Sequence, residues 1–441
     1  MTILHEAGPE PRLEKARHIK YWTRCLKTFL PRQYTGNDSN RMYLAYFIIS
    51  ALDLLDALNT VSTGNERRDH VNWIYRCQHP KGGFRMWPGT DLGDRANDTN
   101  AKWDPANIPA TYFALAALLI LDDDFERVKR GQCLLWLQKM QREDGSFGET
   151  LVDGVVEGGR DPRLGYCATG VRHILRGSSA EPISIDGQTV RDIDVDSFVR
   201  CVRVAESFDG GIADEPFHEP QAGYTFCSLG ALAFVGRLNT PDKSNPIEPN
   251  APCDPHNVLK WLLSRQTELT DPDAGLDTEF HTAEEAPNTQ HAEGKHVSKE
   301  NGARDSKPIR QDPYQSVGSS IFDLLVDGAG MNGRTNKVAD TCYAFWVGAS
   351  LDIVGCVTLC NRAGLRRYLL GKTQHGVLGG FGKFPGDLPD LYHSYLGLAA
   401  LSLAGSDQVK RLDGGMCLSA EARGRLPGLW DAWAVEGPTT T

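Results

Sequence analysis

Five stretches of the chain are apolar around almost the whole circumference of a helix. They are Thr111–Leu121, Tyr166–Leu175, Tyr224–Val235, Cys342–Val354 and Tyr392–Leu403. A helix with almost no polar face is buried on every side. Each stretch follows a segment whose apolar positions keep to one face, as in an amphipathic helix. The pattern therefore predicts helix pairs, each with one buried and one partly exposed member.

The helix pairs form an internal repeat. Each unit has an amphipathic segment that ends near a glutamine or glutamate, then a glycine turn, then the buried helix. The glutamine or glutamate recurs at positions 78, 141, 206, 266 and 374. The first three intervals are about 60 residues, which suits one helical hairpin plus a long turn. The last interval is about 45 residues longer.

Stacked hairpins of this kind predict an all-α fold, an α/α toroid or barrel. The buried helices would form an inner ring and the amphipathic helices an outer ring. A further hairpin, His18–Leu30 and Arg41–Leu58, precedes the first unit and brings the total to about twelve helices. Because the connections are periodic, every inner helix should begin at the same end, and the helix N-termini should surround one cavity.

The long last interval predicts a disordered surface insertion over residues 267–313. Between Thr282 and Asp312 there is no aromatic residue, and charged residues are frequent, a composition that does not form a packed core. We therefore expect a barrel domain over residues 1–406, interrupted by this insertion, and a C-terminal tail over residues 407–441.

Composition narrows the class of protein. The net charge of −10 argues against nucleic acid as the main partner. No apolar run is long enough for a membrane span, and the start of the chain lacks the apolar core of a signal peptide. The eleven cysteines contain no Cys-x-x-Cys pair, which favours free thiols in a reducing, cytoplasmic environment.

The segment at the start of the fourth buried helix contains the densest group of potentially catalytic and metal-binding side chains. It places Arg334, Lys337, Asp340, Cys342 and Tyr343 within ten residues, and Asp340 is a good helix N-cap. A carboxylate and a thiolate two residues apart suit a zinc ion, which needs a third ligand.

The fifth buried helix can supply that ligand. His393 holds nearly the same repeat phase as Cys342, so the two should lie at the same end of the ring. Asp340, Cys342 and His393 with one open position describe a catalytic zinc site.

The same end should carry an aromatic cavity with a cationic rim. The expected wall includes Phe47, Tyr166, Tyr224, Trp346 and Tyr395, and other residues expected there are Arg163, Gln221, Gly223 and Cys227. Such a cavity fits a ligand that is apolar at one end and polyanionic at the other, as a prenyl diphosphate is. Arginine and lysine can grip the phosphates and stabilise the departing diphosphate.

These residues resemble the beta subunits of protein prenyltransferases, most closely those of geranylgeranyltransferase type I. The resemblance covers nearly everything outside the insertion and the tail. Its motifs are His18-Ile-Lys-Tyr, Leu52-Asp-Leu-Leu-Asp56, Tyr166-Cys-Ala, Gly223-Tyr-Thr-Phe-Cys227, Gly333-Arg-x-Asn-Lys337, Asp340-Thr-Cys-Tyr-x-Phe-Trp346 and Asp390-x-x-His393.

The resemblance implies a reaction. Asp340, Cys342 and His393 would hold zinc, and the cysteine of a protein ending in Cys-a-a-X would take the open position. Zinc lowers the pKa of that thiol, and the sulfur attacks C1 of the isoprenoid while diphosphate leaves towards Arg334, Lys337 and Tyr343. The family also implies an obligate alpha subunit, and Rho-type small GTPases as expected substrates.

Four positions bear on which member of the family this is. Farnesyltransferases have a magnesium-binding aspartate ten residues before the zinc histidine; here Lys383 stands there, so magnesium should not be required. The family sets the cavity floor near Tyr43 and Leu396, and a leucine leaves room for a fourth isoprene unit. Both features favour geranylgeranyl transfer. Tyr392 is a farnesyltransferase-like choice at the peptide site, so preference for the last peptide residue should extend beyond leucine.

Gln221 departs from the family motif, and Arg163 has two possible roles. The family usually has a diphosphate-binding histidine where this chain has Gln221, and His218 is a second residue that can compensate. Arg163 can form a structural ion pair or contact the peptide end.

Other functions are a farnesyltransferase beta subunit, a terpene cyclase on the same barrel, and a non-catalytic toroidal binding module. A cyclase would need a buried Asp-x-Asp-Asp motif, which is absent. A binding module should lack a complete ligand set.

Overall fold

The computed structural model describes residues 11–240, 253–269 and 329–435, apart from residues 180 and 186. All described elements belong to one compact unit. Most of the predicted insertion, from residue 270 onward, lies outside the described residues. Its first residues do not: β5 (Gln266–Thr267) pairs antiparallel with β6 (Gly330–Met331).

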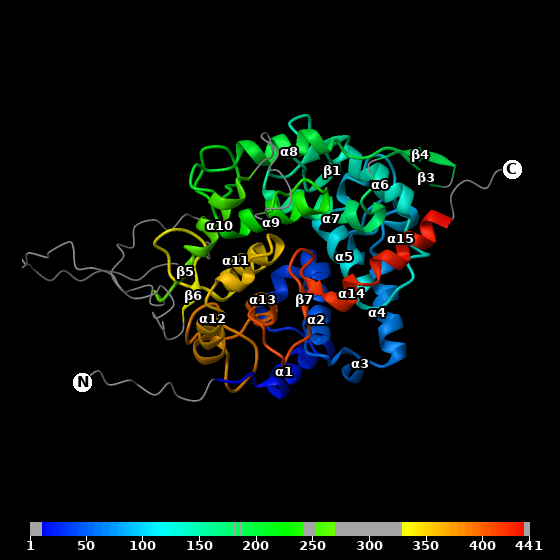
Figure 1. The fold of residues 1–441 in the computed structure, drawn as a ribbon. Helices are drawn as coiled ribbons and strands as arrows, with labels where there is room; N and C mark the ends of the chain where they lie inside the picture. The colour runs from blue at the N-terminus through cyan, green and yellow to red at the C-terminus, as the bar shows by residue number, and fades with distance from the viewer. Residues whose placement is uncertain (1–10, 180, 186, 241–252, 270–328, 436–441) are drawn as a thin grey trace, which may run out of the picture. The chain divides into compact units, whose positions relative to one another are not determined.

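Six helices form a closed inner ring (Figure 1). They are α2 (Arg41–Leu54), α5 (Ile108–Ile120), α7 (Pro162–Arg176), α9 (Ala222–Phe234), α11 (Thr341–Ile353) and α13 (Leu391–Leu403). Each contacts the next in this order, and α13 contacts α2. The predicted α/α toroid is confirmed by this closure.

The amphipathic helices form the outer ring. They are α1 (Lys15–Lys27), α4 (Gly64–Arg76), α6 (Arg130–Lys139), α8 (Val195–Val204), α10 (Pro255–Leu263) and α12 (Arg362–Tyr368), which continues into a π-helical turn, Leu369–Thr373. Contacts join α1 to α2, α4 to α5, α6 to α7 and α10 to α11. No helix among the described residues is long and apolar enough to cross a membrane.

Helix boundaries differ from the sequence expectation in two ways. The last five inner helices begin one to four residues earlier, because each starts directly after its capping side chain, Asn107, Asp161, Gln221, Asp340 or Asp390. The predicted helix over 41–58 is two helices: α2 ends at Leu54, Asp56 has a φ of +54°, and α3 (Leu58–Val61) follows.

The repeated glutamine joins successive units. Gln266 accepts a hydrogen bond from the backbone N–H of Asn361, the N-cap of α12, and donates one back to the Asn361 carbonyl, both at 2.9 Å. Gln141 and Asp194 make the same pair of bonds. The glutamine therefore fixes the start of the next outer helix.

The last repeat closes the ring in the same way. Gln374 accepts from the backbone N–H of Glu14, the N-cap of α1, at 2.9 Å. A side chain on Gly379 would lie 2.5 Å from the carbonyl oxygen of Arg17, so this glycine allows the turn to approach α1. His18 is fully buried there and accepts from the N–H of Gly380 at 3.2 Å.

Short elements complete the fold. They are the antiparallel hairpins β1 (Thr150–Val152) with β2 (Val155–Glu157), β3 (Ile183–Ile185) with β4 (Gln188–Val190) and β7 (Leu412–Asp413) with β8 (Leu418–Ser419), the 3-10 segments η1 (Arg32–Asn40), η2 (Pro88–Thr90), η3 (Gly93–Arg95), η4 (Ala101–Trp103) and η5 (Val357–Leu359), and the helices α14 (Ala420–Arg423) and α15 (Leu426–Val435).

Residues 407–435 are more than the tail expected from the sequence. The β7–β8 hairpin contacts α2, α5 and α13, while α15 contacts α7. Trp430 donates to the carbonyl of Ile174 at 3.0 Å. Apart from α15, its elements have two to four residues, which is too short to show a hydrophobic period.

Candidate active site

The inner helices begin at one end of the ring, and side chains cap five of them. Asn107, Asp161, Gln221, Asp340 and Asp390 each accept a hydrogen bond from a backbone N–H in the first turn that follows. These caps satisfy N–H groups that would otherwise lack partners. They also hold the functional side chains next to them in fixed positions.

Asp340, Cys342 and His393 come together at this end. Their ligand atoms all lie within 4.8 Å of one another. His393 Nε2 is 3.6 Å from Asp340 Oδ1. Asp340 and Cys342 are buried, with 3% and 6% of their surfaces exposed, so solvent contributes little to stabilising charge on them.

His393 is held in the orientation that a metal ligand needs. Its Nδ1 lies 2.6 Å from Asp390 Oδ2, and the other carboxylate oxygen of Asp390 accepts from the His393 backbone N–H at 2.8 Å. A carboxylate on one ring nitrogen leaves the other nitrogen to face the metal. The sequence motif includes Asp390 but does not reveal this role, because a capping carboxylate three residues before a histidine need not reach its ring nitrogen.

The electrostatics of the group favour a bound cation. Burial raises the pKa of Cys342 well above that of an ordinary thiol, and the neighbouring Asp340 carboxylate adds to the effect. A buried thiolate beside a buried carboxylate is stable only with a compensating positive charge. One carboxylate, one thiol and one imidazole are donors that zinc accepts, so the residues fit a metal site.

An aromatic cavity of about 610 Å³ lies inside the inner ring. Of the predicted residues, it is lined by Tyr43, Phe47, Arg163, Tyr166, Cys227, Trp346, Tyr392 and Leu396. Residues that sequence analysis did not single out also line it, namely Tyr46, Tyr112, Phe113, Phe226 and Cys417. The first four lie in buried helices, whose sequences carried no sign of which side faces the cavity, and Cys417 lies in the turn between β7 and β8.

The metal group and the cavity share a wall. The Tyr392 hydroxyl accepts from Trp346 Nε1 at 3.2 Å and also interacts with the Cys342 thiol. The Tyr392 and His393 rings meet edge to face at 5.0 Å between centroids. A reactive group held at Asp340, Cys342 and His393 would therefore lie beside the mouth of the cavity.

The predicted cations lie in the exposed loops before α11 and α13. Arg334 pairs with Glu219 at 3.1 Å, and both side chains are about half exposed. Its charge reaches Tyr343, and the charge of Lys383 reaches Cys342. Lys337 is exposed. These cations are not among the residues that line the cavity.

Gln221 links two helix starts. Its Oε1 accepts from the backbone N–H groups of Gly223 and Tyr224, and its Nε2 donates to the Tyr343 hydroxyl at 3.2 Å. A side chain on Gly333 would lie 2.1 Å from the Tyr343 ring, so this glycine is needed for the loop to lie against that ring.

Other predicted residues lie apart from the cavity. Gly223 and Tyr224 are not among its lining residues. The Tyr395 ring stacks behind Phe47 at 5.4 Å. His218 is exposed and pairs with Asp214 at 2.9 Å. Arg163 pairs with Asp161 at 2.8 Å at the cavity edge, which supports the ion-pair reading and leaves part of its guanidinium exposed.

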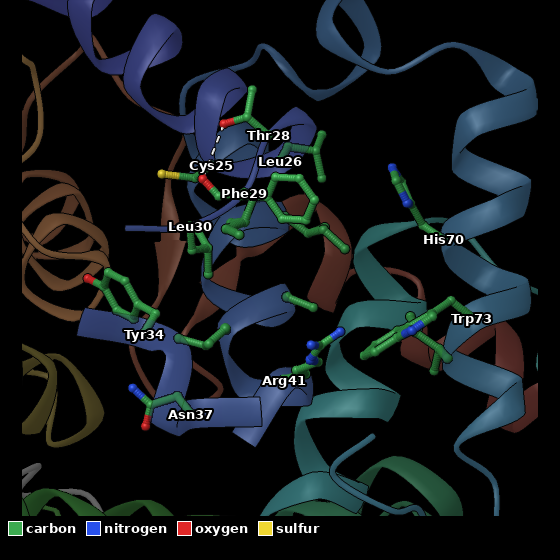
Figure 2. Close-up of a pocket in the computed structure, with 15 residues that line it drawn as sticks. Cys25, Leu26, Thr28, Phe29, Leu30, Tyr34, Asn37, Arg41, His70 and Trp73 are labelled. Atoms are coloured by element: carbon green, nitrogen blue, oxygen red, sulfur yellow. Dashed lines mark hydrogen bonds between the residues drawn. The ribbon is translucent and has the colours of Figure 1, made fainter. Parts of the chain in front are cut away.

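A second hollow, of about 540 Å³, lies between α1, α2 and α4 on the outer side of the ring (Figure 2). Leu26 and Phe29 face His70 and Trp73 across it, and Arg41 lies at its edge. Within the described part of the chain, no group of three potential metal donors occurs there. It is therefore not part of the candidate active site.

The known proteins that this chain resembles include geranylgeranyltransferases of type I. A geranylgeranyl transferase type-1 subunit beta from Arabidopsis thaliana is 28% identical over 90% of this chain and 87% of its own length. One from Dictyostelium discoideum is 27% identical over 94% and 97%. A structure of Candida albicans protein geranylgeranyltransferase-I complexed with GGPP matches with a TM-score of 0.70 at 25% identity, over 95% of this chain and 99% of that chain.

The family comparison covers almost the whole described unit. The prenyltransferase alpha-alpha toroid domain matches residues 13–418, from the start of α1 to the start of β8. The resemblance that the sequence motifs indicate is confirmed by these relatives. The chain belongs to the prenyltransferase alpha-alpha toroid family.

Proposed function

We propose that this chain is the beta subunit of a protein geranylgeranyltransferase of type I. It transfers a geranylgeranyl group from geranylgeranyl diphosphate to the cysteine thiol of a C-terminal Cys-a-a-X sequence and forms a thioether. One observation carries the proposal: three side chains that can hold a metal ion, Asp340, Cys342 and His393, share a wall with an aromatic cavity inside the ring. The names of the relatives support the same function.

Asp340, Cys342 and His393 would hold a zinc ion. Zinc lowers the pKa of a bound substrate thiol, so that a thiolate is available near neutral pH. Asp390 keeps His393 in its ligating orientation through the 2.6 Å contact with Nδ1.

The cavity residues bind and orient the isoprenoid. Aromatic side chains, among them Phe47, Trp346 and Tyr392, contact the apolar chain and exclude water. The substrate sulfur attacks C1 as the C1–O bond breaks, and diphosphate leaves with the bonding electrons. Arg334, Lys337 and the Tyr343 hydroxyl stabilise its charge, with Gln221 as a further donor.

Lys383 supplies the charge that a magnesium ion provides in farnesyltransferases. It precedes His393 by ten residues, and its field reaches Cys342. Leu396 on the cavity wall leaves more room than a ring would. Together these residues support geranylgeranyl over farnesyl transfer.

Farnesyl transfer is the second candidate function. Tyr43 meets Phe47 at 5.4 Å and Phe113 at 6.3 Å between ring centroids, and this aromatic cluster narrows the cavity.

The protein is expected to act as a heterodimer with a helical-repeat alpha subunit in the cytoplasm. Its eleven cysteines are all free, which suits a reducing compartment. Its protein substrates would be Cys-a-a-X proteins, with Rho-type small GTPases as the family expectation.

Competition between the two lipids tests the proposal. The co-expressed heterodimer is first analysed for metal, with about one zinc per beta subunit, and so one per heterodimer, expected. It then receives equimolar geranylgeranyl and farnesyl diphosphate with peptides that end in Leu, Met or Ser. Preferential geranylgeranylation of the Leu peptide supports type I. Preferential farnesylation would assign the farnesyl function, and a zinc-free protein that transfers neither lipid would exclude both.

A further inference from the structure

The turn between β7 and β8 enters the inner ring and is held by four tyrosine hydroxyls. Tyr166 donates to the carbonyl of Gly415 at 2.8 Å, and Tyr112 to that of Met416 at 2.7 Å. Tyr46 and Tyr395 both donate to the carbonyl of Cys417. Three consecutive carbonyls thus receive hydrogen bonds from α2, α5, α7 and α13.

These contacts fix the depth that the turn reaches. Each of the four tyrosines is the fifth or sixth residue of its helix, so they lie in the second turn from the common helix start. The tip of the turn therefore lies inside the ring, at the depth of the second helical turn below the helix starts that carry the candidate site. This position depends on the four hydroxyls together, since each comes from a different helix.

Cys417 is the part of the turn that faces the cavity. The cavity runs from Asn40 and Asp161, at the helix starts, to Tyr46, Tyr112 and Cys417. Burial raises the pKa of the Cys417 thiol to about 12, so the side chain is neutral and acts as a small apolar group. A lipid whose diphosphate stays at the helix starts would direct its far end towards Cys417.

The backbone restricts the side chains that can occupy this position. Cys417 has a φ of +56°, in the left-handed region that glycine adopts freely, that asparagine, aspartate and histidine tolerate, and that branched residues avoid. A small residue here keeps the cavity deep.

We propose that Cys417 is a specificity-determining residue, the floor that limits the length of isoprenoid the cavity accepts. The proposal rests on the proposed function and deepens it. It assigns the length limit to the C-terminal turn in addition to the helical positions Tyr43 and Leu396.

Two substitutions that suit the backbone test the floor in opposite directions. Cys417→Gly removes the side chain, and Cys417→His fills the same space with a ring. The matched control is Cys253→Gly. Cys253 is also buried and also has a positive φ of +67°, but it does not line the cavity.

The measurement is kcat/KM of the heterodimer for diphosphates of three, four and five isoprene units with one Cys-a-a-Leu peptide. Calorimetry of the same diphosphates reports binding separately from turnover. We expect Cys417→His to lower the four-to-three-unit ratio about tenfold or more, the scale of a lost methylene-sized space. Cys417→Gly should raise the five-to-four-unit ratio of kcat/KM several-fold. Cys253→Gly should leave both the four-to-three-unit and the five-to-four-unit ratios unchanged.

The outcomes separate the two proposals. If wild type transfers lipid but both ratios stay within twofold in folded Cys417 variants, the floor assignment is wrong and the function stands. An effect of equal size in Cys253→Gly would also overturn it, since the change would then be general. If wild type neither binds nor transfers any isoprenoid diphosphate, the proposed function fails and the floor fails with it. Should Cys417→His not fold, Cys417→Gly still decides.

Discussion

At the scale of single residues, the site depends on side chains that position other side chains. Asp390 fixes His393, and Gln221 joins the start of α9 to Tyr343. That Asp340, Cys342 and His393 meet could be predicted from the sequence, because each lies at a helix start and the repeat places these starts at one end of the ring. The second contact of Asp390 could not, since a capping carboxylate need not reach a ring nitrogen.

Asp390→Asn separates the two roles of this residue. Asparagine is as good an N-cap as aspartate, so α13 should keep its stability. The variant loses the negative charge on His393 Nδ1, and zinc affinity should fall about 10- to 100-fold. Competition with a chromogenic zinc chelator measures this. The control is Asp254→Asn, the same change at the N-cap of α10, which should leave zinc affinity unaltered; equal losses in both would refute the orienting role.

Lys383→Asp should convert the protein from magnesium-independent to magnesium-dependent transfer. The reason is that a carboxylate there can hold the ion whose charge the lysine replaces. The measurement is the transfer rate with zinc saturated and magnesium varied from none to millimolar. Lys372→Asp changes charge at an exposed lysine of the π-helical turn and should have no such effect. A wild-type enzyme that already requires magnesium would contradict the assignment.

At the scale of elements, the repeat explains how helices join. The sequence shows a glutamine recurring with the period, and the structure shows its use: each one fixes the start of the following outer helix. Periodicity therefore predicted that units exist and how many, because hydrophobic pattern is read along the chain. It could not predict that the glutamine side chain binds the start of the next outer helix, because that hydrogen bond joins two different units.

The contacts that join α1 to the last repeat through His18 should weaken at acid pH. Burial lowers the pKa of His18 to about 4, below the ordinary value of about 6.5. The folded state therefore holds the neutral ring, with Nδ1 accepting from Gly380. The contribution of His18 to the free energy of unfolding is therefore fully present above pH 6.5. It is lost as the pH falls from 6.5 towards 4, and the loss is about 2 kcal/mol at pH 5.

Denaturant unfolding at several pH values checks this contribution. His18→Gln should lower stability at pH 8 and flatten its decline between pH 6.5 and 5. The exposed His256→Gln should unfold with the wild-type pH dependence. If His18→Gln and wild type lose stability in parallel, His18 is not the group responsible.

At the scale of the whole molecule, the C-terminal segment completes the ring from within. Three of the four tyrosine hydroxyls that bind residues 415–417 come from helices 249 to 371 residues earlier in the chain, and the fourth comes from Tyr395, 22 residues earlier. A barrel ending at residue 406, as the sequence suggested, would leave them without these partners.

Truncation after residue 406 should therefore prevent stable folding. Without the segment, the hydroxyls of Tyr46 and Tyr395 still pair, as do those of Tyr112 and Tyr166, so two of the four donors lose their acceptor, at about 1–3 kcal/mol each. The buried apolar side chains of the segment, among them Leu418, are lost as well, and both losses count against a typical stability of about 5–15 kcal/mol. A chain that ends at residue 435 keeps every described contact and serves as the control. Thermal unfolding of the two heterodimers, and recovery of soluble protein, provide the comparison. A 406-residue chain as stable as the control would show that the segment is dispensable.

The sequence by itself determined the helix pairs of the ring, the toroid and the three side chains of the candidate metal group. All of these follow from local periodicity and from spacing relative to helix starts. Only the tertiary structure decided that Asp390 contacts the His393 ring, which faces of the buried helices line the cavity, and that a short C-terminal turn reaches it. These features depend on hydrogen bonds and packing between distant segments, and such contacts leave no periodic trace in the chain.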